Sequence, residues 1–290
     1  MNGWTTLDAA RFLLAQGFGR CGIAPLQGGM WNDVFRVEPA TGQRLTLKHY
    51  RPVMPVTLFP NLPRDEALAL GRLAGLGVAP DFVQLWPNKA VLIYAHVEGP
   101  QWHGDFAAVA RLLLRKEAAD PAGFRPLPTS APAILADADR LFAQCSADEV
   151  TDHWLRLRPV APALPPLAKL SLVHTDMGGE NLIGSGDDLR LIDWQCPGAG
   201  DATEDVASFL SPAVAVINHR PVPQPEDRAS FFAALKRPDI AARHQSLEPC
   251  FAWRMAAYCC LRRQTAETPQ VRELYARALS AELAQFRQTA

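Results

Sequence analysis

The stretch between Leu170 and Gln195 contains the residues with the clearest chemistry. It reads LSLVHTDMGGENLIGSGDDLRLIDWQ. A short apolar segment leads into a polar loop with the spacing His174-x-Asp176-x4-Asn181, and a predicted hairpin follows and ends at Asp193. Groups at the ends of strands are held in defined positions, and this set of groups favours phosphoryl transfer.

Each residue type suits one part of such a reaction. Magnesium takes oxygen ligands, and Asn181 and Asp193 supply an amide and a carboxylate oxygen that would hold metal ions against the phosphates of ATP. A carboxylate with a pKa near ~3.9 is a weak base for an alcohol. We therefore expect Asp176 to orient the attacking hydroxyl and to take its proton late. His174 is expected to brace the loop. The alternative is a polar turn whose side chains only bond the backbone.

Two features upstream suit the phosphates of a nucleotide. Gly28 and Gly29 lie between two predicted extended segments, where glycines let backbone amides approach a ligand closely. A simple hairpin turn is the alternative. The strand predicted over residues 45–50 alternates apolar and polar residues and places Lys48 on its polar side. A solvated lysine is the alternative there.

A helix predicted over residues 62–73 offers a partner for this lysine. Glu66 shares the apolar stripe of the helix and therefore points inward, where a carboxylate needs a partner. Lys48 is the expected partner, and the ion pair would aim its ammonium at the phosphates. Asp65 is the competing carboxylate, although it lies nearer the other side of the helix.

Composition limits the possible classes of protein. The 290 residues, 48% hydrophobic, can build a sizeable core in one large domain or two lobes. The 29 basic and 30 acidic residues leave a net charge of −1, which disfavours nucleic acid and anionic membranes as partners. No apolar run approaches the ~20 residues of a membrane span, and the N-terminal segment predicts an amphipathic helix rather than a signal peptide. The six cysteines show no metal or redox spacing, which predicts a reduced, cytoplasmic protein.

Taken together, these features resemble the aminoglycoside phosphotransferase and choline kinase-like enzymes, which are relatives of protein kinases. The resemblance covers residues 23–210 and rests on the order and spacing of its motifs: Gly28-Gly29 with Asn32, Lys48, Glu66, a strand ending at Gly99, His174-x-Asp176-x4-Asn181, Ile192-Asp193-Trp194, and Gly200-Asp201 followed by Asp205-Val206-Ala207. The Asp-Trp pair favours this family over protein kinases, which have Asp-Phe-Gly. Thr175 and Gln195 stand where the family often has Gly and Glu. These two differences weaken assignment to a particular branch of the family, but they remove no metal ligand and no catalytic aspartate.

The resemblance implies an α+β, two-lobed, protein-kinase-like fold. The N-terminal lobe (1–97) would hold an antiparallel sheet and one key helix, the hinge would lie at 94–99, and the C-terminal lobe (98–290) would be mainly helical. Within the C-terminal lobe, residues 212–225 are expected to be irregular and residues 226–286 to form three helices.

The resemblance also assigns roles and cofactors. It implies ATP and Mg²⁺ as cofactors, Asp176 as the catalytic aspartate, and Asn181 and Asp193 as the magnesium ligands. Asp205 would support the catalytic loop. The nucleotide would be bound by Gly28, Gly29, Asn32, Lys48, Glu66 and the backbone of Ala95 and Val97.

These observations favour an ATP-dependent phosphotransferase that moves the γ-phosphate onto a hydroxyl of a small metabolite. An amino-alcohol kinase of the choline or thiamine type and an aminoglycoside kinase are narrower alternatives. A non-catalytic nucleotide-binding regulator and a protein kinase are alternatives of other classes. The filled catalytic positions argue against the regulator, because a scaffold has no need of all three groups.

The C-terminal region bears on the acceptor. Residues 218–290 contain eleven basic and seven acidic residues, and Arg254, Tyr258 and Arg262 share one face of a predicted helix. This face is either a solvated basic surface or a pocket wall, with arginines suited to carboxylate or phosphate and a tyrosine that stacks on the acceptor. Both interpretations predict a neutral, zwitterionic or anionic acceptor rather than a polycation such as an aminoglycoside.

Overall fold

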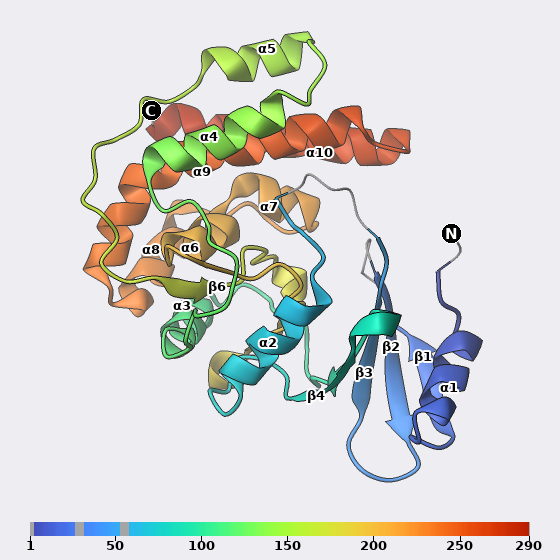
Figure 1. Cartoon of the computed structure of the whole chain (residues 1–290). Coiled ribbons are helices and arrows are strands. Elements are labelled where there is room, and N and C mark those ends of the chain that lie inside the picture. Colours follow the sequence, from blue (N-terminus) through green and yellow to red (C-terminus); the bar gives the residue numbers. More distant parts are fainter. Residues whose placement is uncertain (1–2, 27–31, 53–57, 290) are drawn as a thin grey trace.

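The computed structural model describes residues 3–26, 32–52 and 58–289. The sheet and the N-terminal helix lie on one side of the molecule, most of the later helices lie on the other, and the helix over residues 63–73 lies between them (Figure 1). The predicted α+β kinase-like fold is confirmed: a five-stranded antiparallel sheet with its helix precedes a mostly helical C-terminal part. The lobe boundary after residue 97 stays a prediction.

The N-terminal part is built around one sheet with the strand order β1-β2-β3-β5-β4. Its elements are α1 (Thr6–Ala15), β1 (Cys21–Pro25), β2 (Asn32–Pro39), β3 (Leu45–Tyr50), α2 (Pro63–Leu73), β4 (Phe82–Trp86) and β5 (Val91–Ala95). All neighbouring strands are antiparallel. A reciprocal Thr5–Asp8 capping box starts α1.

The alternation of β3 decides which side chains meet α2. Leu45 and Leu47 are buried in the hydrophobic cluster that joins the sheet to α1. Successive strand residues point to opposite faces, so Lys48 and Tyr50 point the other way, toward α2. That helix lies between the sheet and the helical part of the molecule (Figure 1).

The helical part contains seven longer helices and one short one among the described residues: α3 (Phe106–Lys116), α4 (Ala131–Phe142), α5 (Glu149–Arg156), α6 (Thr203–Leu210), α7 (Pro212–Ile217), α8 (Pro225–Leu235), α9 (Pro238–Gln264) and α10 (Pro269–Thr289). The three helices expected over residues 226–286 are confirmed as α8, α9 and α10. The expectation of irregular structure from residue 212 is wrong, because α7 starts there. Ser211 caps this helix by accepting a hydrogen bond from Val214 N, and Pro212 occupies the first turn, where it fits without strain.

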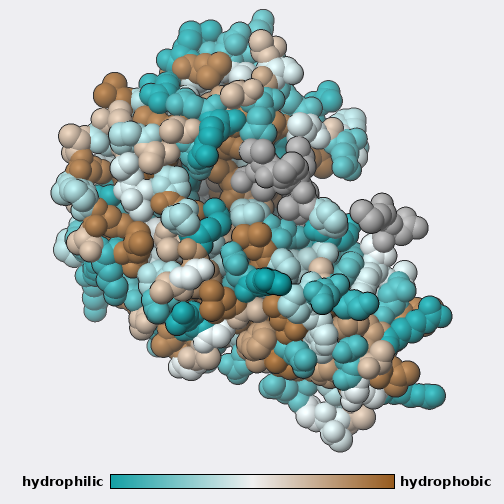
Figure 2. All heavy atoms as spheres, viewed as in Figure 1, coloured by the Kyte–Doolittle hydropathy of each residue, from teal (hydrophilic) through white to brown (hydrophobic). Residues whose placement is uncertain are grey.

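Two small two-stranded sheets support the polar loop: β6 (Ser171–Val173) with β9 (Gly198–Gly200), and β7 (Leu182–Ile183) with β8 (Arg190–Leu191). Apolar side chains are gathered inside, in one cluster around α2, α3 and α6 and another around α4, α9 and α10. On the face in Figure 2, hydrophilic and hydrophobic residues are interspersed. Within the described part of the chain, no helix is long and apolar enough to span a membrane.

Candidate active site

The loop after β6 is held by a buried carboxylate from α6. Asp205 accepts hydrogen bonds from the backbone N–H groups of His174 (2.9 Å) and Thr175 (2.9 Å). Thr175 has a φ of +71°, which is unusual for a β-branched residue. Its hydroxyl donates to the carbonyl of Cys196 at 2.9 Å. These bonds hold the unfavourable backbone conformation that turns the chain toward Asp176.

The imidazole of His174 serves the loop rather than the reaction. Its Nδ1 accepts a hydrogen bond from the Asp176 N–H (3.2 Å), and its Nε2 lies 3.0 Å from the carbonyl of Ile192. Because a backbone N–H can only donate, Nδ1 carries no proton and Nε2 donates. Burial lowers the pKa of His174, which agrees with a neutral ring. The ring also packs edge-on against Trp194.

Asp176 follows this fixed turn and carries an unusual charge environment. Burial, followed by the nearby carboxylates of Glu180 and Asp193, raises the pKa of Asp176 to about 8. A carboxyl with a pKa of about 8 is mostly protonated at pH 7 in the unliganded site, and once ionised it binds a proton more strongly than an ordinary aspartate. The fold therefore moves the pKa of Asp176 away from the ordinary aspartate value that its sequence alone predicts.

The predicted ion pair between Lys48 and Glu66 is present. The Lys48 Nζ lies 2.7 Å from Glu66 Oε2, and the two residues are each only 1% exposed. Lys48 also contacts Asp193 Oδ1. Burial opposes the charge of Lys48, but the carboxylates of Asp193 and Glu66 outweigh it and raise the pKa of the lysine. Lys48 is therefore a cation held between β3, α2 and the end of the catalytic hairpin.

Glu66 has further partners that the sequence did not reveal. The hydroxyl of Tyr50 donates to Oε2, and the backbone N–H of Trp194 donates to Oε1 at 3.1 Å. Tyr50 is two residues after Lys48 and on the same face of β3, so the period of the strand was a signal that could have predicted it. Both oxygens of Glu66 are thus used. Asp65, the competing carboxylate, has no contact with Lys48.

Asn181 and Asp193 both border the catalytic loop. The Asn181 Nδ2 donates to the backbone carbonyl of Asp176 at 3.0 Å, which leaves the amide oxygen for a ligand. Asp193 has a φ of +63°. Carboxylate and amide oxygens are donors that magnesium prefers. Among the described residues there is no cluster of three or more His, Cys, Asp or Glu side chains that could hold a metal without other ligands.

Two of the other predicted nucleotide-binding residues, Asn32 and Ala95, lie at opposite ends of the sheet. Gly28 and Gly29 lie outside the described residues. Asn32 begins β2 and donates from Nδ2 to Gln195 Oε1 at 2.7 Å, which joins the sheet to the residues after Asp193. Ala95 ends β5 and its N–H donates to Asp81, whereas Val97 lies beyond the strand.

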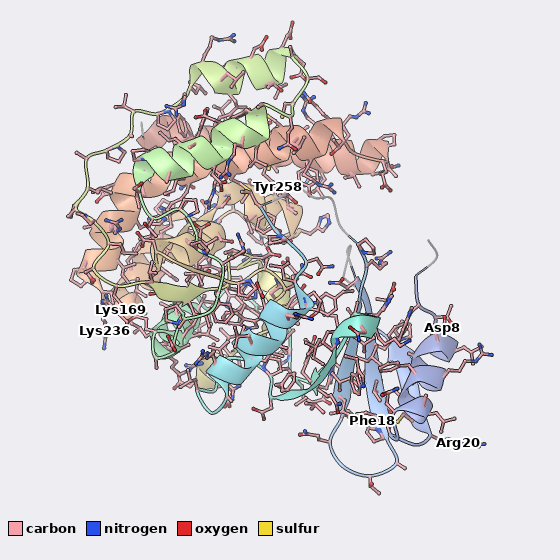
Figure 3. The ribbon with its side chains drawn as sticks, in the orientation of Figure 1. Asp8, Phe18, Arg20, Lys169, Lys236 and Tyr258 are labelled. Atoms are coloured by element: carbon pink, nitrogen blue, oxygen red, sulfur yellow. The ribbon has the colours of Figure 1, made fainter. Side chains whose placement is uncertain are left out.

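The expectation of a solvated basic face on α9 is wrong. Arg254 is buried, and its guanidinium forms an ion pair with Glu204. Tyr258 is buried as well, with ring centroids 5.0 Å from Phe59 and 6.1 Å from Tyr275. Figure 3 shows Tyr258 on the side of α9 that faces the segment leading into α2. Arg262 lies further along the helix, with its guanidinium 5.6 Å from the Tyr275 ring.

A cavity of about 310 Å³ reaches the catalytic loop at Thr175, whereas Asp176, Asn181 and Asp193 do not line it. Arg254 also lines it, which supports the pocket-wall interpretation for that residue alone; Tyr258 and Arg262 do not line it. The lining contains four carboxylates and three guanidinium groups: Asp137, Glu204, Glu248, Glu282, Arg125, Arg140 and Arg254. Asp137 and Glu204 add negative charge to this lining from outside residues 218–290, the region from which a non-cationic acceptor was expected. The charge of the acceptor stays a prediction.

The fold and the site together define a kinase for small molecules. Residues 22–247 match the phosphotransferase enzyme family, and the chain belongs to that family. A search of curated proteins found no significant match.

Solved structures with the same fold cover nearly the whole chain. A choline/ethanolamine kinase family protein from Mesorhizobium loti has 18% sequence identity and a TM-score of 0.65, with 98% of this chain and 100% of that chain covered. A spectinomycin phosphotransferase in complex with ADP and spectinomycin has 12% identity, a TM-score of 0.62 and coverage of 99% and 100%. An aminoglycoside phosphotransferase with AMP-PNP and hygromycin B has 14% identity, a TM-score of 0.63 and coverage of 97% and 98%. At such identities the likeness concerns the fold.

Proposed function

We propose that the protein transfers the γ-phosphate of ATP to a hydroxyl group of a small metabolite. The observation that carries the proposal is the buried Lys48, in contact with both Glu66 and Asp193 at the edge of the loop that contains Asp176. Burying an ammonium and two carboxylates costs more desolvation free energy than burying apolar side chains of similar size. A phosphotransferase has a use for such an ammonium, because it offsets the dense negative charge of the phosphates.

The nucleotide would lie between the sheet and the catalytic loop. Lys48 would exchange its contact with Asp193 for the phosphates, and Glu66 would keep its ammonium in place. The backbone of Ala95 and Val97 would bind the adenine, as the family resemblance implies. Asn32, fixed by Gln195, would hold the start of β2 close to the phosphates.

Asn181 and Asp193 would hold Mg²⁺. Magnesium commonly takes one or two protein ligands and completes its shell with water and substrate phosphates, so this two-residue set fits. When bound, the ion would neutralise part of the phosphate charge. The contact between Lys48 and Asp193 keeps the carboxylate paired until the nucleotide arrives.

Asp176 would act on the acceptor. Its carboxylate would accept a hydrogen bond from the acceptor hydroxyl and orient the oxygen toward the γ-phosphorus. As the new O–P bond forms and the bond to the leaving ADP oxygen breaks, the hydroxyl proton would pass to Asp176.

The cavity beside Thr175 is the proposed acceptor site. Its volume of about 310 Å³ lies at the lower end of the range of about 300–1,000 Å³ for ligand pockets. This size favours a short-chain or single-ring hydroxyl compound over a multi-ring antibiotic. Amino alcohols fall within the class, since carboxylates and guanidinium groups both line the cavity.

A coupled assay of ADP release with MgATP tests the proposal. The acceptors would be amino alcohols, thiamine, simple sugars and kanamycin, each compared with the Asp176→Asn variant. We expect release with at least one small acceptor, little with kanamycin, and release slower by ~10²-fold or more in the variant. Efficient turnover of kanamycin would contradict the proposed size class, and equal release by Asp176→Asn would contradict the mechanism.

A further inference from the structure

A buried lysine on α3 touches the support of the catalytic loop. Lys116 is 2% exposed, and its Nζ lies 3.1 Å from Asp205 Oδ2. The same ammonium donates a hydrogen bond to the backbone carbonyl of Leu172 in β6. Lys116 therefore joins three elements that are far apart in the sequence: α3, the strand before the loop, and α6.

The carboxylate of Asp205 is the common point of these contacts. It accepts from the backbone N–H groups of His174 and Thr175, and it faces the ammonium of Lys116. A buried carboxylate is costly unless it is paired and fully hydrogen-bonded. Two backbone donors supply hydrogen bonds but no net charge, so Lys116 provides the positive charge that this buried anion needs.

The loop depends on this carboxylate because its backbone is strained. A non-glycine residue with φ near +70°, as in Thr175, costs on the order of 1–3 kcal/mol. Such a conformation persists only where surrounding contacts hold it, and the N–H of Thr175 is held by Asp205 at 2.9 Å. The next residue is Asp176, so a shift of Thr175 changes where the Asp176 carboxylate points.

We propose that Lys116 is a positioning residue for phosphoryl transfer, acting through Asp205 on the backbone of His174 and Thr175. The inference rests on the proposed function, since it concerns the aim of Asp176 at the acceptor. Lys116 is buried in the core and does not touch the nucleotide side of the site, where Lys48 and Glu66 lie. Its loss therefore affects the chemical step and leaves nucleotide binding intact.

Arg115, the preceding residue of α3, is a matched control. Its Nη2 donates to the backbone carbonyl of Leu189 at 3.1 Å. It is a basic side chain on the same helix that also bonds a backbone carbonyl, but it has no contact with Asp205 or with the loop. Replacing Arg115 therefore shows how the fold responds when α3 loses a basic side chain that bonds a backbone carbonyl but does not contact Asp205.

The kinetic test compares Lys116→Met, Lys116→Arg and Arg115→Met with the wild type, using MgATP turnover with water or the best acceptor found. A displacement of about 1 Å at a catalytic group costs about 10²-fold in rate. We expect turnover of Lys116→Met to fall 10- to 100-fold with the KM for MgATP within about threefold. Lys116→Arg, which keeps the charge, should recover part of the loss, and Arg115→Met should stay within threefold of the wild type.

Thermal unfolding identifies any variant that does not fold. If Lys116→Met fails to fold, Lys116→Arg decides: intermediate turnover with unchanged MgATP affinity supports the inference. Wild-type turnover in the folded Lys116 variant, an equal loss in Arg115→Met, or a parallel loss of MgATP affinity overturns it.

A spectroscopic readout separates this inference from the proposed function, because it needs no turnover. The His174 ring should show the Nε2–H tautomer by ¹⁵N NMR in the wild type and in Arg115→Met, since Nδ1 accepts from Asp176 N–H. Lys116→Met should lose that signature as the loop shifts. An unchanged His174 spectrum in Lys116→Met overturns the role of Lys116 whatever the reaction is. Absence of phosphoryl transfer in the wild type, with the spectral change present, overturns only the proposed function.

Discussion

Replacing Glu66 with glutamine tests the ion pair at the centre of the nucleotide site. Glu66 uses both carboxylate oxygens: Oε2 faces Lys48 at 2.7 Å and accepts from Tyr50, and Oε1 accepts from the N–H of Trp194 at 3.1 Å. Glutamine has one acceptor oxygen and one NH₂ group. In either orientation, the NH₂ group faces a donor, so at least one buried donor loses its acceptor.

The size of the effect follows from these contacts. An unsatisfied buried donor costs about 1–3 kcal/mol, and breaking a buried ion pair costs about 3–5 kcal/mol when a charge is left unpaired. Lys48 keeps its contact with Asp193 in the variant, so we expect a loss where the two ranges meet, about 3 kcal/mol of unfolding free energy. The ammonium would then lean toward Asp193 and away from the phosphates. A loss of about 1.4 kcal/mol there corresponds to a tenfold rise in the KM for MgATP.

Urea unfolding and initial-rate kinetics on the same preparations measure both effects. Asp65→Asn is the control, because Asp65 is the neighbouring carboxylate on α2 and does not contact Lys48. The reasoning is refuted if Glu66→Gln loses less than about 0.5 kcal/mol and its KM stays within twofold. It is equally refuted if Asp65→Asn behaves in the same way as Glu66→Gln.

Three further predictions concern the loop, the metal and the core. Asp176→Asn should lower turnover by ~10²-fold or more while MgATP binds almost normally, because it removes only the orientation of the hydroxyl and the proton acceptor; single-turnover kinetics with a nucleotide titration measures this. Asp193→Ala should abolish magnesium-dependent nucleotide binding, because the site loses its only proposed carboxylate ligand, and calorimetric titration with and without Mg²⁺ measures it. Glu282→Gln should flatten the pH dependence of stability, as urea unfolding at pH 5 and pH 8 will show. Burial raises the pKa of Glu282 from 4.5 to about 7, so the stability from its bound proton is complete below pH 4.5 and is lost as pH rises toward 7. The loss of unfolding free energy is about 3 kcal/mol at 1.36 kcal/mol per pKa unit. Glutamine avoids this loss because it does not ionise, and its single oxygen can still accept hydrogen bonds from Ser211 Oγ and Ala213 N.

Each of these has an outcome that contradicts it. Near wild-type turnover in Asp176→Asn would mean that another group accepts the proton. Unchanged MgATP affinity and unchanged metal dependence in Asp193→Ala would remove Asp193 from the metal site. A Glu282→Gln variant with the same loss of stability between pH 5 and pH 8 as the wild type would show that other groups cause that dependence.

Local pattern was enough to predict the elements around the catalytic loop. The spacing of His174, Asp176 and Asn181 is set within one turn and one hairpin, so residues close in sequence carry the whole signal. The inward position of Glu66 follows from helical periodicity, and the side of β3 that presents Lys48 follows from strand alternation. Since each residue has one expected face, their pairing was a natural prediction, and the 2.7 Å contact confirms it.

Short-range signals were less reliable at element boundaries. Residues 212–225 were expected to be irregular, yet Pro212 lies in the first turn of α7, where its missing N–H has no cost. The helical spacing of Arg254 and Tyr258 was correct, but the periodicity of α9 does not say whether its faces meet solvent or other helices. Contacts from Glu204 and Phe59 bury these two side chains.

Only the tertiary structure decided the charge environment of the site. The raised pKa of Asp176 comes from burial and from carboxylates that folding brings together. The cavity wall combines α4, α6, α9 and α10, and no local sequence signal relates an aspartate at 137 to a glutamate at 282. Lys116 stands on the apolar stripe of α3, which marks it as unusual, but its partner, Asp205, is 89 positions further along the chain. Sequence patterns report what each side chain must face, whereas the identity of a distant partner is fixed only when the helices and strands pack.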